Sequence, residues 1–147
     1  MVNNSVYLMH SSTPQNIGTL KEPTNIAEIK FEENGKDANI SVFVLNDGGK
    51  IKEIKYLAKA SIPVVASLSY LSVILKGKKV GDALALQTDE IVSALSLPEH
   101  YQYCAKRALE AIQKAFHESE DPFDRAFKSI SEYNGPYEGN QPYGFED

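Results

Sequence analysis

Residues 26–58 read IAEIKFEENGKDANISVFVLNDGGKIKEIKYLA, and this stretch decides the fold class. Apolar and polar residues alternate over 26–31, which is typical of a strand with one buried face. Two turn signals, Asn34-Gly35 and Asp47-Gly48-Gly49, separate this segment from runs at 40–45 and 51–58 that have strand character. The stretch therefore predicts a three-stranded antiparallel meander.

Helical patterns follow the meander. Pro63 suits the first turn of a helix and Ser61 is a candidate N-cap, while apolar residues lie nearly all round from Val64 to Leu75. This pattern predicts a deeply buried helix that ends at Gly77. We expect a short helix over 88–95 with Thr88 as its N-cap, a break at Leu97-Pro98, and an amphipathic helix from about residue 98 to 117. A short helix or turn over 6–10 precedes the sheet.

The order of these elements predicts an α+β protein in which the helices pack on one face of the sheet. The chain has 147 residues, a length that fits one domain. Its single cysteine, Cys104, excludes an internal disulfide, and no basic leader is visible at the start, so we expect a reducing, cytoplasmic setting. No apolar run of ~18 residues is present, which predicts no membrane association.

The negative charge is concentrated near the C-terminus. Residues 118–147 hold 8 acidic and 2 basic side chains, a net charge of −6, which leaves 12 acidic and 13 basic side chains, or +1, in residues 1–117. The overall net charge of −5 argues against nucleic-acid binding, which needs a basic surface. We therefore expect a domain over 1–117 and an acidic, Tyr- and Gly-rich extension over 118–147, with room for one helix at 123–130.

General catalytic motifs are missing from the sequence. It has no glycine-rich phosphate loop, no Cys-x-x-Cys pair and no nucleophile elbow, so we expect a protein that is not an enzyme. His10, His100 and His117 are scattered, and the simplest interpretation of each is a surface or structural residue. Cys104 lies on an apolar helical stripe and would by default be a small buried side chain.

Several stretches, taken together and in order, resemble the IscU family, the scaffold proteins of iron–sulfur cluster assembly that also form the N-terminal part of NifU. Residues 10–18, His-Ser-Ser-Thr-Pro-Gln-Asn-Ile-Gly, resemble the family's opening His-x-x-x-Pro-x-Asn-hydrophobic-Gly. Further similar segments are the turn at Asp47-Gly48-Gly49, the loop Lys76-Gly77-Lys78, the break at Leu97-Pro98 and the helix over 104–112. The resemblance covers residues 7 to about 117 and implies the fold of that family over the 1–117 domain.

The same resemblance implies a degenerate ligand site. The family holds its metal or cluster with three cysteines, assisted by an aspartate and a histidine. The matching positions here read Gly35-Lys36-Asp37 for Cys-Gly-Asp, Ser61 for the second cysteine, and Tyr103-Cys104 for His-Cys. Asp37 and Cys104 thus remain as candidate metal ligands, while Gly35, Ser61 and Tyr103 stand at replaced positions. The family's Leu-Pro-Pro-Val-Lys chaperone motif keeps only Leu97-Pro98.

Two donors are few for the chemistry of this family. Iron–sulfur clusters usually take four thiolates, and zinc takes four donors or three and a water. His100 lies one helical turn before Cys104 and could replace the lost histidine, and Lys59 is a candidate to favour the thiolate form of Cys104. The simpler interpretation of His100 is a surface residue, and that of Lys59 is a lysine at the end of a strand.

Three hypotheses follow. The chain is a scaffold-like protein that binds iron or sulfur weakly through Asp37 and Cys104; or it is an interaction or regulatory protein that keeps the fold without a cluster; or the fold is reused for an unrelated ligand. Iron, zinc or a 2Fe–2S cluster held across a homodimer are the candidate cofactors. The resemblance implies a cysteine desulfurase or a complete scaffold as partner. The extension is either solvated, or packs over the ligand end, or docks a basic partner.

Overall fold

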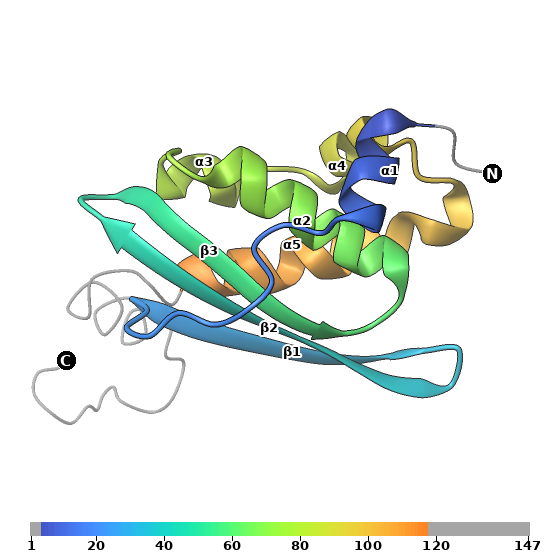
Figure 1. Cartoon of the computed structure of the whole chain (residues 1–147), viewed down its shortest axis with the longest axis horizontal. Helices are drawn as coiled ribbons and strands as arrows, with labels where there is room; N and C mark the ends of the chain where they lie inside the picture. The colour runs from blue at the N-terminus through green and yellow to red at the C-terminus, as the bar shows by residue number, and fades with distance from the viewer. Residues whose placement is uncertain (1–3, 118–147) are drawn as a thin grey trace, which may run out of the picture.

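The computed structural model describes residues 4–117, and Figure 1 shows a single sheet with helices on one of its faces. The sheet contains three antiparallel strands in the order β1-β2-β3: Asn25–Glu33, Lys36–Asp47 and Lys50–Lys59. The helices are α1 Ser5–Ser12, α2 Ile62–Leu75, α3 Val80–Ala85, α4 Thr88–Leu95, the 3-10 turn η1 Glu99–Tyr101, and α5 Gln102–His117. The predicted α+β architecture with a three-stranded meander is confirmed.

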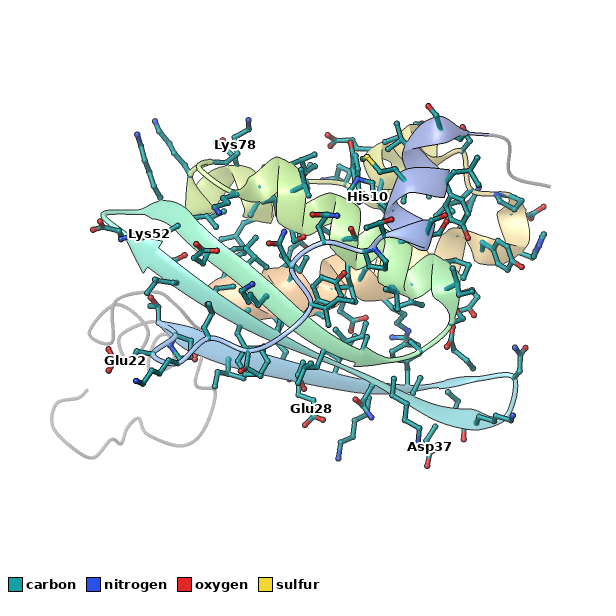
Figure 2. The ribbon with its side chains drawn as sticks, viewed as in Figure 1. His10, Glu22, Glu28, Asp37, Lys52 and Lys78 are labelled. Carbon is teal, nitrogen blue, oxygen red and sulfur yellow. The ribbon has the colours of Figure 1, made fainter. Side chains whose placement is uncertain are left out.

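Alternation along the strands sorts their side chains between the two faces of the sheet. In β1, Ala27, Ile29 and Phe31 are buried against the helices, whereas Glu32 and the other intervening residues are exposed. Glu32 pairs with Asp37 across the β1–β2 ladder, and Glu33 pairs with Lys36. Glu33 therefore lies on the helix side of the sheet, and Asp37 lies on the opposite side, where Figure 2 shows it pointing away from the helices.

The core lies between the sheet and the pair α2 and α5. Both helices bury large apolar side chains completely, among them Leu68 and Leu71 in α2 and Ile112 and Phe116 in α5. The buried face of the sheet provides Ile40, Val42, Val44, Ile54 and Tyr56. Each such side chain contributes about 1.5–3 kcal/mol by leaving water. Among residues 4–117, no helix is long and apolar enough to cross a membrane.

Of the two predicted helix caps, Ser61 is confirmed in position and Thr88 is wrong. Ser61 occupies the N-cap position of α2, but its side chain makes no cap hydrogen bond, because its hydroxyl donates instead to the carboxylate of Glu33. Thr88 is the first helical residue of α4 rather than its cap. The N-cap is Gln87, whose backbone N–H donates to Glu90 Oε2 at 3.1 Å.

Other differences arise from contacts between distant parts of the chain. Helix α3 was not predicted. The Gln113 side chain, from α5, donates to the carbonyls of Ala83 at 3.1 Å and Leu86 at 3.1 Å, which satisfies acceptors at the end of α3. The long last helix begins as η1 before it continues as α5. The helix expected over 123–130 and the extension itself lie outside the described residues.

The segment before the sheet is held against α2 by one buried and two part-buried hydrogen bonds. The His10 ring nitrogen Nδ1 lies 2.6 Å from Ser69 Oγ, and the backbone N–H of Gln15 donates to the same hydroxyl at 2.8 Å. Asn16 adds a bond from its side-chain amide to Ser72 Oγ at 2.9 Å. His10 is buried, so its role in this structure is structural.

Candidate functional site

One end of the molecule brings together three segments that are far apart in sequence. Glu33 is the last residue of β1, Ser61 precedes α2, and Tyr103 and Cys104 lie in the first turn of α5. We call these four residues the Glu33 cluster. It contains two of the three replaced ligand positions and the remaining thiol, so it is the candidate functional site.

The carboxylate of Glu33 is the centre of this cluster. Its Oε1 accepts the backbone N–H of Ser61 at 2.8 Å, and its Oε2 accepts the Ser61 hydroxyl at 2.7 Å. The Tyr103 hydroxyl donates to the same Oε2 at 2.6 Å. One carboxylate thus joins the end of the β1–β2 hairpin to the start of α2 and the start of α5. Bonds of this kind, with a charged acceptor, are stronger than neutral ones.

The directions of the pKa shifts favour a charged Glu33 carboxylate beside a neutral Tyr103 phenol. Burial alone would raise the pKa of the Glu33 carboxyl, but the hydrogen bonds from Tyr103 and Ser61 outweigh it and lower the pKa below its usual value. Burial and the bond to Glu33 raise the pKa of the Tyr103 phenol. The proton therefore stays on Tyr103, and the negative charge stays on Glu33.

Cys104 is fully buried, as its place on the apolar stripe predicts, with 0% of its surface exposed. Its Sγ lies 3.9 Å from the Ser61 hydroxyl oxygen. Burial is the main cause that raises the pKa of this thiol, and the nearby Glu33 charge acts in the same direction. The neutral thiol is therefore favoured near neutral pH, which is unfavourable for a metal ligand or a nucleophile.

Asp37 occupies a different surface from Cys104. It lies on the outer side of β2 and lines a pocket of about 580 Å³ together with Glu33, Lys59 and Ser61, whereas Cys104 is not part of that lining. Lys59 is exposed and faces this pocket rather than the thiol. The structure thus brings Ser61, Tyr103 and Cys104 together and leaves Asp37 at the rim. A metal site formed by Asp37 and Cys104 remains a prediction.

The other two predicted positions lie away from the thiol. His100 is exposed on η1, where its ring contacts Tyr101 with 4.2 Å between ring centroids. Gly35 is in the turn between β1 and β2 with φ +78°, a left-handed backbone that favours glycine over a residue with a side chain. The turn geometry therefore gives a physical reason for glycine at this replaced position.

The donors of the Glu33 cluster do not fit an iron–sulfur cluster. One buried thiol is available where such a cluster usually takes four thiolates. Within residues 4–117, no three or more His, Cys, Asp and Glu side chains are grouped so that they could hold a metal ion. The oxygen atoms that are present are already hydrogen-bonded to one another.

Sequence reasoning missed Glu33, the residue at the centre of the site. The alternation that buries Ala27, Ile29 and Phe31 extends to position 33, so the periodicity contained the signal that Glu33 faces the helices. The resemblance to the family's Cys-Gly-Asp motif pointed to Asp37 instead.

The fold and the site together define a class: an α+β domain in which a three-stranded meander and two long helices meet at an end that contains one thiol. The family model of the NifU-like N terminal domain matches residues 3–121. The chain belongs to this family.

Curated relatives of the chain include proteins from several eukaryotes and from an archaeon. The chain is 30% identical over 111 residues to "Iron sulfur cluster assembly protein 1, mitochondrial" of Debaryomyces hansenii. The aligned residues cover 74% of this chain and 62% of that protein. The protein of the same name from Eremothecium gossypii is 30% identical over 109 residues, 72% of this chain and 71% of that protein. "Iron-sulfur cluster assembly protein IscU" of Plasmodium falciparum is also 30% identical, over 72% of this chain and 66% of its own length. The chain thus spans less than two thirds of the first of these relatives.

Solved structures support the same fold. A Fervidobacterium islandicum protein, described as a scaffold for the SUF system of iron–sulfur cluster assembly, superposes with a TM-score of 0.60 at 13% identity, over 78% of this chain and 96% of that one. A crystal structure described as a hypothetical protein gives a TM-score of 0.57 at 20% identity, over 77% and 95% of the two chains. At such low identity these similarities concern the fold.

Proposed function

We propose that the chain works in iron–sulfur cluster assembly as a scaffold-like, non-enzymatic protein that binds assembly partners without holding a cluster of its own. The observation that carries this proposal is the Glu33 carboxylate, which is hydrogen-bonded to Ser61 and Tyr103 at the replaced ligand positions. Membership of the NifU-like N-terminal family supports the pathway. The closed cluster of hydrogen bonds supports the lack of a bound metal.

The expected partners are a cysteine desulfurase or a complete scaffold protein. Exposed apolar side chains on α1 and at the start of α2, Leu8, Met9 and Ile62, offer contact area for a partner. Weak iron or sulfur binding would need a homodimer that joins two Cys104 thiols and two Asp37 carboxylates, and the buried thiols would first have to become exposed. A cytoplasmic location is part of the proposal, although two of the relatives are named as mitochondrial.

Anaerobic reconstitution of the full chain with iron and sulfide tests the lack of a cluster. We expect no visible cluster absorbance and no metal retained per chain after desalting, because one protonated, buried thiol provides too few ligands. A complete scaffold treated in parallel controls the chemistry. A cluster band in this chain that disappears in Cys104→Ser would overturn the proposal in favour of cluster binding across a dimer.

Binding to purified partners tests the positive part of the proposal. The chain is mixed separately with a cysteine desulfurase and with a complete scaffold, and each mixture is followed by size-exclusion chromatography with light scattering. We expect a stable complex with one of the two, weakened by Ile62→Glu at the exposed start of α2. If neither protein binds, the assignment to the assembly pathway is wrong.

A further inference from the structure

Five lysines gather at the end of the molecule opposite the Glu33 cluster. Two come from the start of β3 and three from the loop between α2 and α3, and we call the set the lysine end: Lys50, Lys52, Lys76, Lys78 and Lys79. All five are exposed. Figure 2 shows Lys52 and Lys78 at the same end of the molecule, beside the β2–β3 turn.

Backbone hydrogen bonds hold the two lysine-bearing segments together. The N–H of Gly77 donates to the carbonyl of Ile51 at 2.7 Å, and the N–H of Ile51 donates to the carbonyl of Lys78 at 2.8 Å. The N–H of Val80 donates to the carbonyl of Gly49 at 2.9 Å. The lysine side chains therefore project from one continuous surface, around a depression of about 380 Å³ lined by Lys50, Lys52 and Lys76 together with one acidic residue, Asp47.

Four of the five lysines form no ion pair with a described residue, and the acidic residue Asp47 beside Lys50 offsets only part of the positive charge. Within the described part of the chain, Lys76 forms an ion pair with Glu53 at 3.5 Å, and the other four lysines form none. Like charges within a Debye length of ~10 Å repel one another at moderate salt. An anionic partner would remove this repulsion, so the lysine end fits an acidic peptide.

Helix α5 ends on the side of the lysine end, and the acidic segment 118–147 follows it in the sequence. Between Cys104 and His117, helix α5 rises by about 20 Å, so its described C-terminus lies at the end away from the Glu33 cluster. Near that terminus, Gln113 donates to carbonyls of α3, the helix that begins directly after Lys79. Residues 118–147 carry a net charge of −6, and 30 residues can extend up to ~100 Å.

A second basic surface is less suited to the same segment. The groove along α5 is lined by Lys106, Arg107 and Lys114, with a volume of about 630 Å³. Lys114 already donates to the carbonyl of Glu28 at 2.9 Å, and Arg107 pairs with Glu110 at 3.0 Å. Two of these three cations have partners, whereas four of the five lysines at the lysine end form no ion pair within residues 4–117.

We propose that the lysine end binds the acidic segment 118–147 of the same chain. Each exposed ion pair contributes only about 0.2–1 kcal/mol and is weakened by salt. Covalent connection compensates, because a short flexible tether gives an effective concentration in the millimolar range. The contact is therefore populated at low salt and lost at high salt, and an acidic segment of another protein would have to displace it.

Paramagnetic relaxation enhancement in the full chain tests this proposal. A nitroxide is attached to the introduced thiol of the Glu138→Cys variant, while buried Cys104 stays unlabelled, as checked by mass spectrometry. At about 0.01 M salt, where the Debye length is ~30 Å, we expect amides 50–52 and 76–79 to lose more than about half of their intensity. At about 1 M salt, where the Debye length is ~3 Å, we expect the intensity of these amides to return.

Charge reversal provides the matched comparison. The double variant Lys52→Glu with Lys78→Glu is expected to abolish the enhancement, whereas Lys30→Glu with Lys36→Glu, at exposed positions toward the other end of the sheet, leaves it unchanged. Broadening around the Glu33 cluster or the α5 groove instead would overturn the proposal. So would the absence of broadening, or broadening in a mixture in which spin label and ¹⁵N are on different molecules.

Discussion

Replacing Glu33 by alanine is expected to destabilise the protein by about 2 kcal/mol and to make Cys104 react roughly 30-fold faster with a thiol reagent. The carboxylate accepts three hydrogen bonds, from the Ser61 backbone N–H, the Ser61 hydroxyl and the Tyr103 hydroxyl, and each bond to a charged group is worth about 1.5–3 kcal/mol before solvent exposure reduces it. Without these bonds the starts of α2 and α5 separate more readily from the hairpin, which exposes Cys104. A loss of about 2 kcal/mol raises the population of this open state by a factor of up to 30, and the rate of thiol modification rises with it.

Glu32→Ala is the matched control for this prediction. Glu32 is the neighbouring residue in the same strand, with the same charge, but its side chain lies on the exposed outer face of the sheet. Chemical denaturation and the rate of reaction with a disulfide reagent under native conditions measure both effects. Equal behaviour of the two variants would show that the Glu33 cluster does not protect Cys104. Tyr103→Phe, which removes one of the three bonds, is expected to give an intermediate rate.

The same cluster predicts sensitivity to acid. The pKa of the Glu33 carboxyl is lower in the folded protein than its usual value of about 4.5, so the folded state binds its proton more weakly than the unfolded state does. Its contribution to stability is complete above about pH 4.5 and is lost as the pH falls through the folded pKa. In Glu33→Ala, the decrease in stability below pH 4.5 is expected to be smaller than in the parent.

Replacing Ser69 by alanine is expected to cost about 2–4 kcal/mol, which is the second large effect. Its hydroxyl lies 2.6 Å from His10 Nδ1 and accepts the Gln15 backbone N–H at 2.8 Å. The variant leaves both groups without this partner. An unsatisfied buried polar group such as the His10 ring nitrogen costs about 1–3 kcal/mol, and loss of the part-buried bond from the Gln15 N–H adds a smaller amount. Thermal or chemical unfolding of the variant gives the value directly.

Ser67→Ala controls for the loss of a buried hydroxyl on the same helix. Ser67 is equally buried at 0% exposure, but its hydroxyl donates at 2.8 Å to the carbonyl of Pro63, one turn back in α2. Such local bonds add little to stability, so a cost below about 1 kcal/mol is expected. If Ser67→Ala costs as much as Ser69→Ala, the contact with His10 and Gln15 is not what stabilises the N-terminal segment.

Much of the fold was predictable because it depends on local patterns. Alternation identified the three strands, and the apolar run after Pro63 identified α2. Strand β2 is longer than predicted, since its polar ends pair with β1 and β3 through backbone hydrogen bonds that hydrophobic patterns do not report. The burial of Cys104 followed from its place on an apolar helical stripe.

The candidate site was only partly predictable. Resemblance pointed to Ser61, Tyr103 and Cys104, and these three residues do lie together. It also pointed to Asp37, whose strand position places it on the outer face of the sheet, while Glu33 takes the inner position. A shift of one residue along a strand reverses the face, so a motif match alone could not settle which carboxylate faces the helices.

The sequence by itself determined the class of fold, the shortage of thiols and the separation of an acidic segment from a nearly neutral domain, because each depends on composition or on short-range periodicity. Only the tertiary structure decided which polar groups meet. Glu33 reaches Tyr103 across 70 positions, and His10 reaches Ser69 across 59. Those contacts depend on how α2 and α5 pack on the sheet, and packing brings together side chains whose spacing in the sequence carries no signal of their proximity.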